Sequence, residues 1–467
     1  MINRLVQRTR FAIYCIALSS FFSSSVDAMN FDTAWQQTLE KSDSLAADRD
    51  NIAISEALRD AATDLYLPKV DLIASYTHMQ KPIALDIKAL EPFRSLDPGV
   101  LSAELAALIG PLLTTTPTVT NFTEQNVTSS LITAIWPLYT GGSRGAAIDI
   151  AKEQASEASM LLAMKQQSKF EDLARVYFGV SLAAQLVKTY QEVERGLYQH
   201  QQNAIKLEEQ GQIARVQRLK ADAAYDKAKV DTQKAIHQYE IAQLALSSFL
   251  HVNEPVIPST DLFVRQNLHE QSYYLDKTMG SYPGLDILDS KRKQAQKKVT
   301  IAKSNYLPKV FMYGTHNIYE DDSLVSQASP DWLVGVGVSV PIFDNTGRSG
   351  KLSAARTSVS KLSHLKAQAY RNLKLLVEQT FREAEQAKQE YNGLASSQEL
   401  AEETLKLNQK AFSQGLATSV DVVDAEMFQA SVKTQRLSAA YQHVLALAKL
   451  SALSGDMANF LHSNQIQ

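Results

Sequence analysis

Cysteine is almost missing from this sequence, and histidine is thinly spread. The single cysteine, Cys15, lies in an apolar stretch near the N-terminus. The rest of the chain therefore has no disulfide, thiolate nucleophile or cysteine metal ligand. The nine histidines are scattered, and none forms a pair four residues apart beside a carboxylate, the spacing typical of a helical metal site. We expect no catalytic residue, no cofactor and no metal site.

A basic excess is also missing. Arg4, Arg8, Arg10 and Asp27 fall in a segment that we expect to be removed. Without them, 47 basic and 50 acidic residues become 44 and 49. Nucleic-acid binding needs a basic surface, so this balance argues against a nucleic-acid partner. After this segment no run approaches the roughly 18 apolar residues of a membrane-spanning helix.

The first 28 residues have the pattern of a cleaved signal peptide. Three arginines precede an apolar stretch at 11–22, and Val26-Asp27-Ala28 is a small-residue cleavage site. The apolar stretch is too short to cross a bilayer as a helix. The sequence therefore predicts an exported protein.

Proline is absent from two unusually long helix-forming segments, 145–210 and 347–413. At 1.5 Å per residue each would be roughly 100 Å long, which predicts coiled-coil packing rather than an ordinary globular domain. The expected return helices, 214–250 and 418–454, are shorter. Helices at 285–305 and 31–65 are available to continue them.

The chain contains an internal duplication. Tyr-Leu-Pro-Lys-Val occurs at 66–70 and again at 306–310, an offset of 240 residues. Pro-Leu-Tyr shortly before Arg144 is matched by Pro-Ile-Phe before Arg348, an offset of 204 residues. A repeat of this length is far longer than a solenoid unit of about 20–50 residues. It indicates two copies of one large unit.

Four segments have the alternation of strands. In 332–343, valines occupy one face and mostly small residues the other, over about the length of a tilted transmembrane strand. The other three expected strands are 69–80, 126–139 and 309–316. Four strands are too few to close a barrel, so strands in a membrane require several chains to share one. A soluble β-sandwich surface is the alternative.

The two copies differ mainly between their first two strands. The segment 81–120 in the first copy is about 36 residues longer than its counterpart, and leucines at helical spacing occur between Pro98 and Pro111. A loop that joins strands is expected at the end of the barrel away from the helices. The predicted layout is a signal peptide at 1–28, a first repeat at 29–253, an equatorial connection at 254–283, a second repeat at 284–456 and a C-terminal tail at 457–467.

The duplicated order of strand, proline, glycine turn and long helix resembles a TolC-type outer-membrane efflux protein. The paired Leu-Pro-Lys-Val motifs and the run 415–425, Gly-Leu-Ala-Thr-Ser-Val-Asp-Val-Val-Asp-Ala, carry this resemblance over nearly the whole chain after residue 28. It implies a mixed α/β membrane protein that forms a homotrimer in the outer membrane. Four strands per chain would make a twelve-stranded barrel, which continues into a long helical tunnel in the periplasm. No cofactor is implied.

The resemblance also implies partners and a function. The protein would dock with a periplasmic adaptor, act indirectly with an inner-membrane pump, and serve as the exit duct of an efflux pump or a type I secretion system. Gly211 and Gly415 would lie at the tips that meet the adaptor. The exported substrate is not encoded in any recognisable pocket motif.

Asp421 and Asp424 would ring the closed periplasmic entrance. They stand three residues apart on one helix face, so a trimer would bring six carboxylates together. An ordinary acidic first turn, favoured by the helix dipole, explains the same residues equally well. Ala417 stands where some relatives have a basic latch residue. The ring would be neutralised by bound cations or by basic neighbours, for which Arg215 and Arg218 near the facing turn are the available candidates.

Two other classes of function remain open at this point. One is a soluble periplasmic coiled-coil scaffold or adaptor, which the valine-alternating strand argues against. The other is an enzyme, which the lack of any clustered nucleophile, base or metal ligand argues against. A glycine-rich turn before Arg144 lacks the Gly-Lys-Ser/Thr ending of a phosphate loop, so a strand-to-helix turn explains it better.

Overall fold

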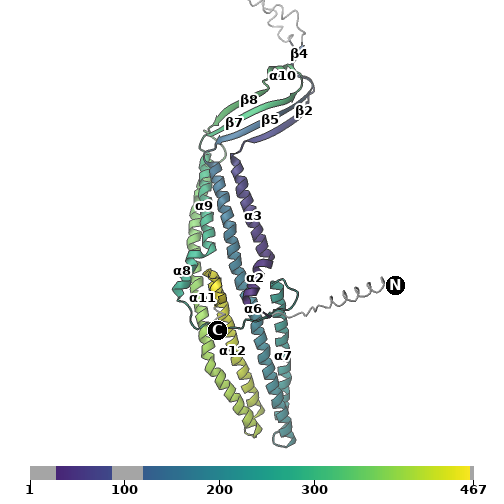
Figure 1. Cartoon of the computed structure of the whole chain (residues 1–467), viewed down its shortest axis with the longest axis vertical. Coiled ribbons are helices and arrows are strands. Elements are labelled where there is room, and N and C mark those ends of the chain that lie inside the picture. The colour runs from purple at the N-terminus through teal and green to yellow at the C-terminus, as the bar shows by residue number, and fades with distance from the viewer. Residues whose placement is uncertain (1–27, 87–118, 463–467) are drawn as a thin grey trace, which may run out of the picture. The chain divides into compact units, whose positions relative to one another are not determined.

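The computed structural model describes residues 28–86 and 119–462, in which helices predominate (Figure 1). The chain forms two compact units. Unit 1 contains residues up to 52, 157–289 and 364 onward, and unit 2 contains 53–156 and 290–363. The expected signal peptide, except Ala28, lies outside the described residues, as does 87–118 of the 81–120 insertion with its expected helix.

Two long helical hairpins supply most of unit 1. The first joins α6 (Ser143–Glu209) to α7 (Arg215–Phe249), and the second joins α11 (Arg348–Ser413) to α12 (Ser419–Leu453). The buried positions of α12 are largely alanine, valine and leucine, which allow close helix packing. No helix among the described residues is both long and apolar enough to span a membrane.

Shorter elements complete unit 1. They are β1 (Ala28–Met29), α2 (Phe31–Lys41), the start of α3 (Asp43–Thr63), β6 (Ile257–Pro258), α8 (Gln271–Ser281), the start of α9 (Pro283–Ser304) and α13 (Met457–His462). Strands β1 and β6 pair in parallel. The segment 254–283, expected only to connect the repeats, therefore contains a strand and a helix.

The core of unit 1 centres on aromatic side chains. The Phe31 ring lies 5.3–5.5 Å from the rings of Phe170, Tyr177, Phe178 and Phe460. Such contacts stabilise beyond the area that they bury, by about 0.5–1.5 kcal/mol each. Phe460 belongs to α13 and is fully buried. The expected C-terminal tail at 457–467 thus begins with a short helix that buries an aromatic side chain.

Unit 2 is built on a four-stranded antiparallel sheet in the order β2-β5-β7-β8 (Figure 1). The strands are β2 (Lys69–His78), β5 (Asn126–Tyr139), β7 (Lys309–Glu320) and β8 (Trp332–Ser339). Among the described residues, β2 and β8 are edge strands with a partner on one side only. The unit also contains η1 (Asp64–Tyr66), the short pair β3 (Ala84–Asp86) and β4 (Val119–Asn121), and α10 (Leu324–Ala328).

The duplication extends to the register of the two strand hairpins. Lys69 pairs with Ile135, and Lys309 pairs with Ser339. Adding 240 to the first number and 204 to the second converts one pair into the other. The same two offsets relate every pair up to Tyr76 with Thr128 and its counterpart in the second hairpin. The two hairpins are thus equivalent residue by residue.

Three strand ends differ from the expected ranges, and the smallest difference is in β2, which ends at His78 instead of 80. β8 ends at Ser339 instead of 343, whereas β5 continues through the equivalent residues to Tyr139. The reason is that the end of β5 pairs with β7, while the end of β8 faces the open edge of the sheet. β7 reaches Glu320, four residues beyond expectation, because Ser129 in the longer β5 pairs with it.

Two glycines in β8 make room for aromatic rings of β7. A Cβ atom at Gly335 would lie 2.6 Å from Cζ of Tyr313, and one at Gly337 would lie 2.6 Å from Cζ of Phe311. These rings lie across the strand positions that lack side chains, which compensates for the packing that glycine loses. The small residues expected on this face thus have a packing role.

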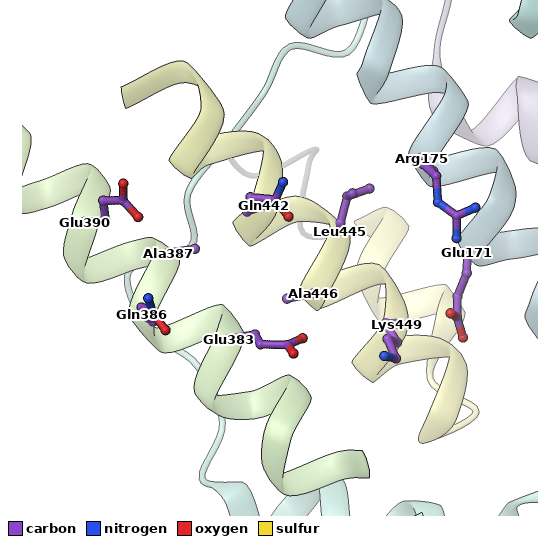
Figure 2. Close-up of a pocket in the computed structure, with 10 residues that line it drawn as sticks. All are labelled: Glu171, Arg175, Glu383, Gln386, Ala387, Glu390, Gln442, Leu445, Ala446 and Lys449. Atoms are coloured by element: carbon purple, nitrogen blue, oxygen red, sulfur yellow. The ribbon is translucent and has the colours of Figure 1, made fainter. Parts of the chain in front are cut away.

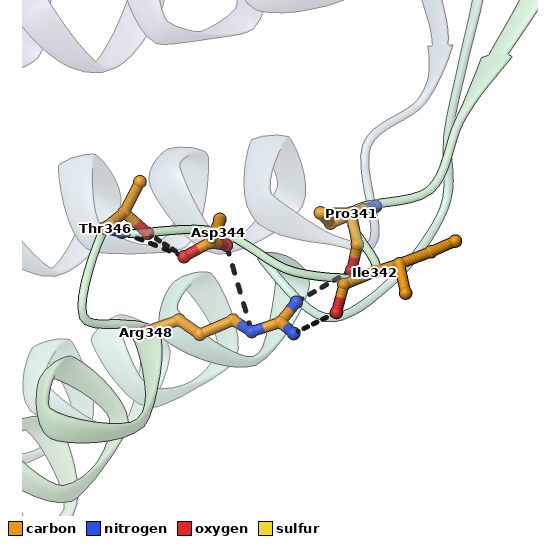
Figure 3. Close-up of polar contacts among 5 residues, drawn as sticks. All are labelled: Pro341, Ile342, Asp344, Thr346 and Arg348. Carbon is orange, nitrogen blue, oxygen red and sulfur yellow. Dashed lines mark hydrogen bonds and ion pairs between the residues drawn. The ribbon is translucent and has the colours of Figure 1, made fainter.

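Each copy has an arginine at the start of its long helix that fastens the turn from the strand. The Arg348 guanidinium donates to the carbonyls of Pro341 and Ile342 at 2.8 and 2.9 Å (Figure 3). Arg144 donates to the carbonyl of Leu138, the counterpart of Ile342, at 2.9 Å. Each guanidinium also lies 4.6 Å from the ring of the tyrosine of the Tyr-Leu-Pro-Lys-Val motif in its copy. The repeated motif therefore holds the junction between sheet and helix.

Candidate entrance at the tips of the helical hairpins

The two hairpin tips in unit 1 have the same backbone turn. Gly211 and Gly415 adopt positive φ angles of 70° and 74°, and a Cβ atom on either would meet no atom within 4 Å. The residue after each glycine donates from its N–H to the carbonyl five residues earlier, at 2.8 and 2.9 Å. This is the Schellman arrangement that ends helices. Glycine is required by the backbone angle, and both tips remain open to contact.

Asp421 caps the helix that follows the second tip. Its Oδ2 accepts hydrogen bonds at 2.7 Å from both the N–H and the hydroxyl of Thr418. The Thr418 hydroxyl in turn accepts from the N–H of Asp421, which completes a capping box. The bonds from Thr418 lower the pKa of Asp421. Asp424, one turn later, is exposed. Asp421 thus has a structural role in addition to the role expected from the resemblance.

Arg215 and Arg218, the expected basic partners of Asp421 and Asp424, have other surroundings in a single chain. Arg218 forms an ion pair with Glu208 at 2.8 Å and lies 3.7 Å from Asp222, both in its own hairpin. Arg215 is exposed at the first position of α7. Within one chain Arg218 is thus engaged by acidic residues of its own hairpin, and neutralisation of Asp421 and Asp424 by Arg215 or Arg218 stays a prediction.

Buried polar contacts join the two tips. The N–H of Ser419 donates to Oε1 of Gln217 at 3.1 Å, and the Ser419 hydroxyl lies 2.7 Å from Nε2 of His200. Ser419 and His200 are buried, and burial lowers the pKa of His200 to about 4. The imidazole is therefore neutral at physiological pH. It also packs against the Phe412 ring at 4.5 Å. The contact between buried His200 and Ser419 therefore joins the tips of the two hairpins.

An apolar cluster lies beside this polar link. Its buried members come from all four hairpin helices and are Ala204, Ala221, Leu405, Phe412, Val422 and Ala425. The cluster gives the tips a packed interior of their own, separate from the aromatic core. Leu416, immediately after the second glycine, is by contrast 79% exposed and offers an apolar contact at the tip.

Glu426 is a buried acid that the sequence reasoning did not single out. It lies on α12 and is only 5% exposed, and a Cβ atom at Gly196 on α6 would lie 2.5 Å from its Oε1. Burial, followed by the nearby carboxylate of Glu192, raises the pKa of Glu426 to about 7. Its Oε2 is buried without a hydrogen-bond partner. The signal in the sequence was Gly196, an otherwise costly glycine inside a long helix.

Unit 1 also contains a charged pocket of about 350 Å³ between α6, α11 and α12 (Figure 2). Its lining residues are Glu171, Arg175, Glu383, Gln386, Ala387, Glu390, Gln442, Leu445, Ala446 and Lys449. Burial raises the pKa of Glu171, and the nearby Lys449 opposes this shift. Its charged lining residues are three glutamates, one arginine and one lysine. No group of three or more metal-ligating side chains occurs among the described residues.

Comparison with known sequences identifies the family. The family model described as outer membrane efflux protein matches residues 34–250 and 283–456. Protein CyaE of Bordetella pertussis is 22% identical over 244 residues, which cover 51% of this chain and 52% of that protein. The chain thus spans about half the length of this curated relative.

Solved structures share the fold over nearly the whole chain. The outer-membrane channel OprN superposes with a TM-score of 0.72 at 16% identity, covering 91% of this chain and 89% of that one. The outer membrane protein VceC of Vibrio cholerae gives 0.71 at 14% identity, with 91% and 96% covered. The open MtrE channel of Neisseria gonorrhoeae gives 0.70 at 19% identity, with 91% and 88% covered.

The resemblance to TolC-type proteins is confirmed by these matches, and so is the location in the outer membrane. The matched residues include both hairpin tips, the four-stranded sheet and both long helices. The chain belongs to the outer membrane efflux protein family.

Proposed function

We propose that this protein is the exit duct of an efflux pump or a type I secretion system, through which small molecules or proteins pass from the periplasm to the exterior. The observation that carries the proposal is a duplicated unit whose four-stranded sheet, in the described part of the chain, has a partner on only one side of each edge strand. A sheet with open edges is not tolerated in lipid, so it requires further copies to close. Family membership gives the duct its outer-membrane setting.

Three copies would supply twelve strands and close one barrel. Its outer face would carry the apolar side chains that one chain leaves exposed, among them Leu72, Tyr76, Val336 and Val338, which are 61–68% exposed. The long hairpins would form the tunnel in the periplasm. A trimer also explains why exposed leucines and valines recur along α7 and α11.

The hairpin tips are the proposed docking points for a periplasmic adaptor, through which an inner-membrane pump would connect. Gly211 and Gly415 turn the backbone without a side chain, and the exposed Leu416 offers an apolar contact. Asp421 and Asp424 are the proposed periplasmic constriction. Arg215 is exposed and free to approach a neighbouring copy, whereas Arg218 acts within its own hairpin.

Fractionation and sizing test this proposal against a soluble periplasmic scaffold. The expected result is a protein that remains with outer membranes and runs as a trimer in mild detergent, with strand signal in circular dichroism. A protein released into the periplasmic fraction, or a folded monomer in detergent, contradicts the duct. Deletion of the gene, followed by screens for lost drug resistance and lost secreted proteins, then identifies the substrate class.

A further inference from the structure

We propose that β8 of one copy pairs antiparallel with β2 of the next copy in the register that β5 makes with β7, so that Val338 lies opposite Ala74 of the neighbour. This inference rests on the proposed shared barrel and goes further by assigning each contact at the junction. It follows from the duplication, because β5 and β8 are equivalent strands, as are β7 and β2.

The equivalence of the strands is established by the two hairpins. Their pairs interconvert with offsets of 240 for β2 and β7 and 204 for β5 and β8. In the middle of the sheet, β5 pairs with β7 through Ala134 and Gly314 and through Trp136 and Met312. Adding 204 to the residue number in β5 and subtracting 240 from the number in β7 gives the expected pairs between copies. They are Val338 with Ala74 of the neighbour and Val340 with Leu72 of the neighbour. The strand junction inside the chain therefore serves as a template for the junction between copies.

The resulting pairs match in chemistry on the exposed apolar face. The pair Ile132 and His316 converts into Val336 and Tyr76, which are 61% and 67% exposed in one chain. Val338 is likewise exposed, and it would meet Ala74. A shift by one residue would place these valines opposite Ser75 and Thr77, which belong to the other face of β2. The apolar band would then be broken at every junction.

The side chains on the opposite face of the sheet also fit the proposed register. The pair Thr133 and Thr315 converts into Gly337 and Ser75. Gly337 is already covered by the Phe311 ring of its own chain, so a small hydroxyl beside it fits the space. Small and polar residues would thus continue around this face of the barrel.

The residues that follow β8 are much more exposed than their equivalents in β5, as expected if a strand of a neighbouring copy covers them. Ile342 and Phe343 are 88% and 92% exposed, whereas the equivalent Leu138 and Tyr139 are 43% and 45% exposed. Tyr139 pairs with Val310, which converts into Phe343 with Val70 of the neighbour. A neighbouring β2 would extend β8 past Ser339 and cover these two side chains, as β7 does for β5.

Disulfide cross-linking tests the register directly, because the chain has no cysteine after Cys15. The double variants Val338→Cys with Ala74→Cys and Val336→Cys with Tyr76→Cys place thiols opposite one another between copies. Within one chain β5 and β7 separate the two edges, so roughly 14 Å divides them, beyond the reach of a disulfide. Any cross-link must therefore join two copies.

We expect both variants to give covalent dimers and trimers on non-reducing gels of the native membrane. Val338→Cys with Leu72→Cys and Val338→Cys with Tyr76→Cys are matched controls for a shift of two residues and should give little product. Predominant cross-linking by either control overturns the register while leaving the trimer intact. A trimer that none of the four pairs cross-links also overturns it. Loss of the trimer in the unaltered protein contradicts the proposed function instead.

Discussion

The carboxylate of Glu426 on α12 occupies the space that a side chain at position 196 of α6 would fill. A Cβ atom at Gly196 would lie 2.5 Å from Oε1 and 2.8 Å from the carboxyl carbon. The same carboxyl has a pKa raised to about 7. A carboxylate with a raised pKa in the folded state destabilises the fold when it ionises. This contact therefore makes the packing of α6 against α12 sensitive to pH.

The first prediction is that Glu426→Gln reduces the loss of stability between pH 5 and pH 8. The penalty is absent below the unfolded value of 4.5, grows as the pH rises, and is complete above about 7. At its full extent it amounts to about 3 kcal/mol per chain. Thermal unfolding followed by circular dichroism across this pH range measures the slope. Glu399→Gln on α11, an exposed acid, is the control and should not change it.

The variant Gly196→Ala tests the same pH dependence of stability in a second way. The added methyl displaces the Glu426 carboxyl towards water, which lowers its pKa and flattens the pH dependence. Gly393→Ala on α11 is the matched control, since a Cβ atom there meets nothing within 4 Å. It should stabilise the helix by up to about 1 kcal/mol with no effect on the pH slope. An unchanged slope in both Gly196→Ala and Glu426→Gln contradicts the assignment of the pH dependence to Glu426.

The second prediction concerns the buried link between the tips. Ser419→Ala removes the partner of Nε2 of His200 and should cost about 1–3 kcal/mol. Hydrogen exchange should rise at both tips together, because Ser419 contacts α6 and α7. Ser413→Ala, which removes an exposed hydroxyl bonded only to its own helix, is the control. Faster exchange confined to the second tip would contradict the link.

His200 also makes the tips sensitive to acid. Its pKa is lowered to about 4, so the neutral form is the folded one, and stability is lost as the pH falls from 6.5 towards 4. His200→Gln should remove this acid-dependent exchange. Exchange rates at the tips measured at pH 7 and pH 5 in the two proteins provide the comparison.

The third prediction concerns the guanidinium contacts at the junctions of sheet and helix. Arg144→Lys and Arg348→Lys keep the charge and lose the forked donors, so each should destabilise its own turn by about 1–3 kcal/mol. The two effects should be similar in size because each guanidinium donates to two carbonyls and lies 4.6 Å from a tyrosine ring. Arg356→Lys, at an exposed position of α11, is the control. Equal stability of all three variants would show that the charge alone matters.

The fourth prediction separates the two acids proposed for the constriction. Asp424→Asn should lower cation selectivity in single-channel recordings and leave stability unchanged, because Asp424 is exposed. Asp421→Asn should also loosen the cap that it forms with Thr418. The double variant Asp421→Ala, Asp424→Ala should lose block by multivalent cations while still assembling. Unchanged selectivity in the double variant returns both residues to an ordinary first helical turn.

Patterns that are local in the sequence predicted much of the fold. The motif at 66–70 and its copy predicted where strands and helices meet, and the proline-free segments predicted the long helices. Contacts between segments that are distant in the sequence could not be predicted from local patterns. Nothing near Phe460 shows that it packs against Phe31, and nothing near Arg218 shows that Glu208 binds it. The early end of β8 at Ser339 follows from its place at the edge of the sheet, which the sequence of one strand does not report.

The positions of the two glycine turns between the hairpin helices were predicted from the sequence, whereas the contacts around them were not. The two glycines could be recognised in the sequence because a turn with a positive φ angle strongly favours glycine. Glu426 and His200 gain their properties from burial against another helix, which periodicity does not report. Asp421 was considered both for a ring and for an ordinary first turn, and its capping role supports the second without excluding the first.

The contact between Phe31 and Phe460 has a consequence for the order of events during biogenesis. These rings belong to segments near opposite ends of the sequence and share one aromatic core. A chain that crosses a membrane from its N-terminus delivers Phe31 well before Phe460. The hairpins, whose contacts are local, are able to form early, whereas this core has to wait for closure of the longest loop. For a chain that crosses in this order, the aromatic core therefore forms only after the segment with Phe460 has followed.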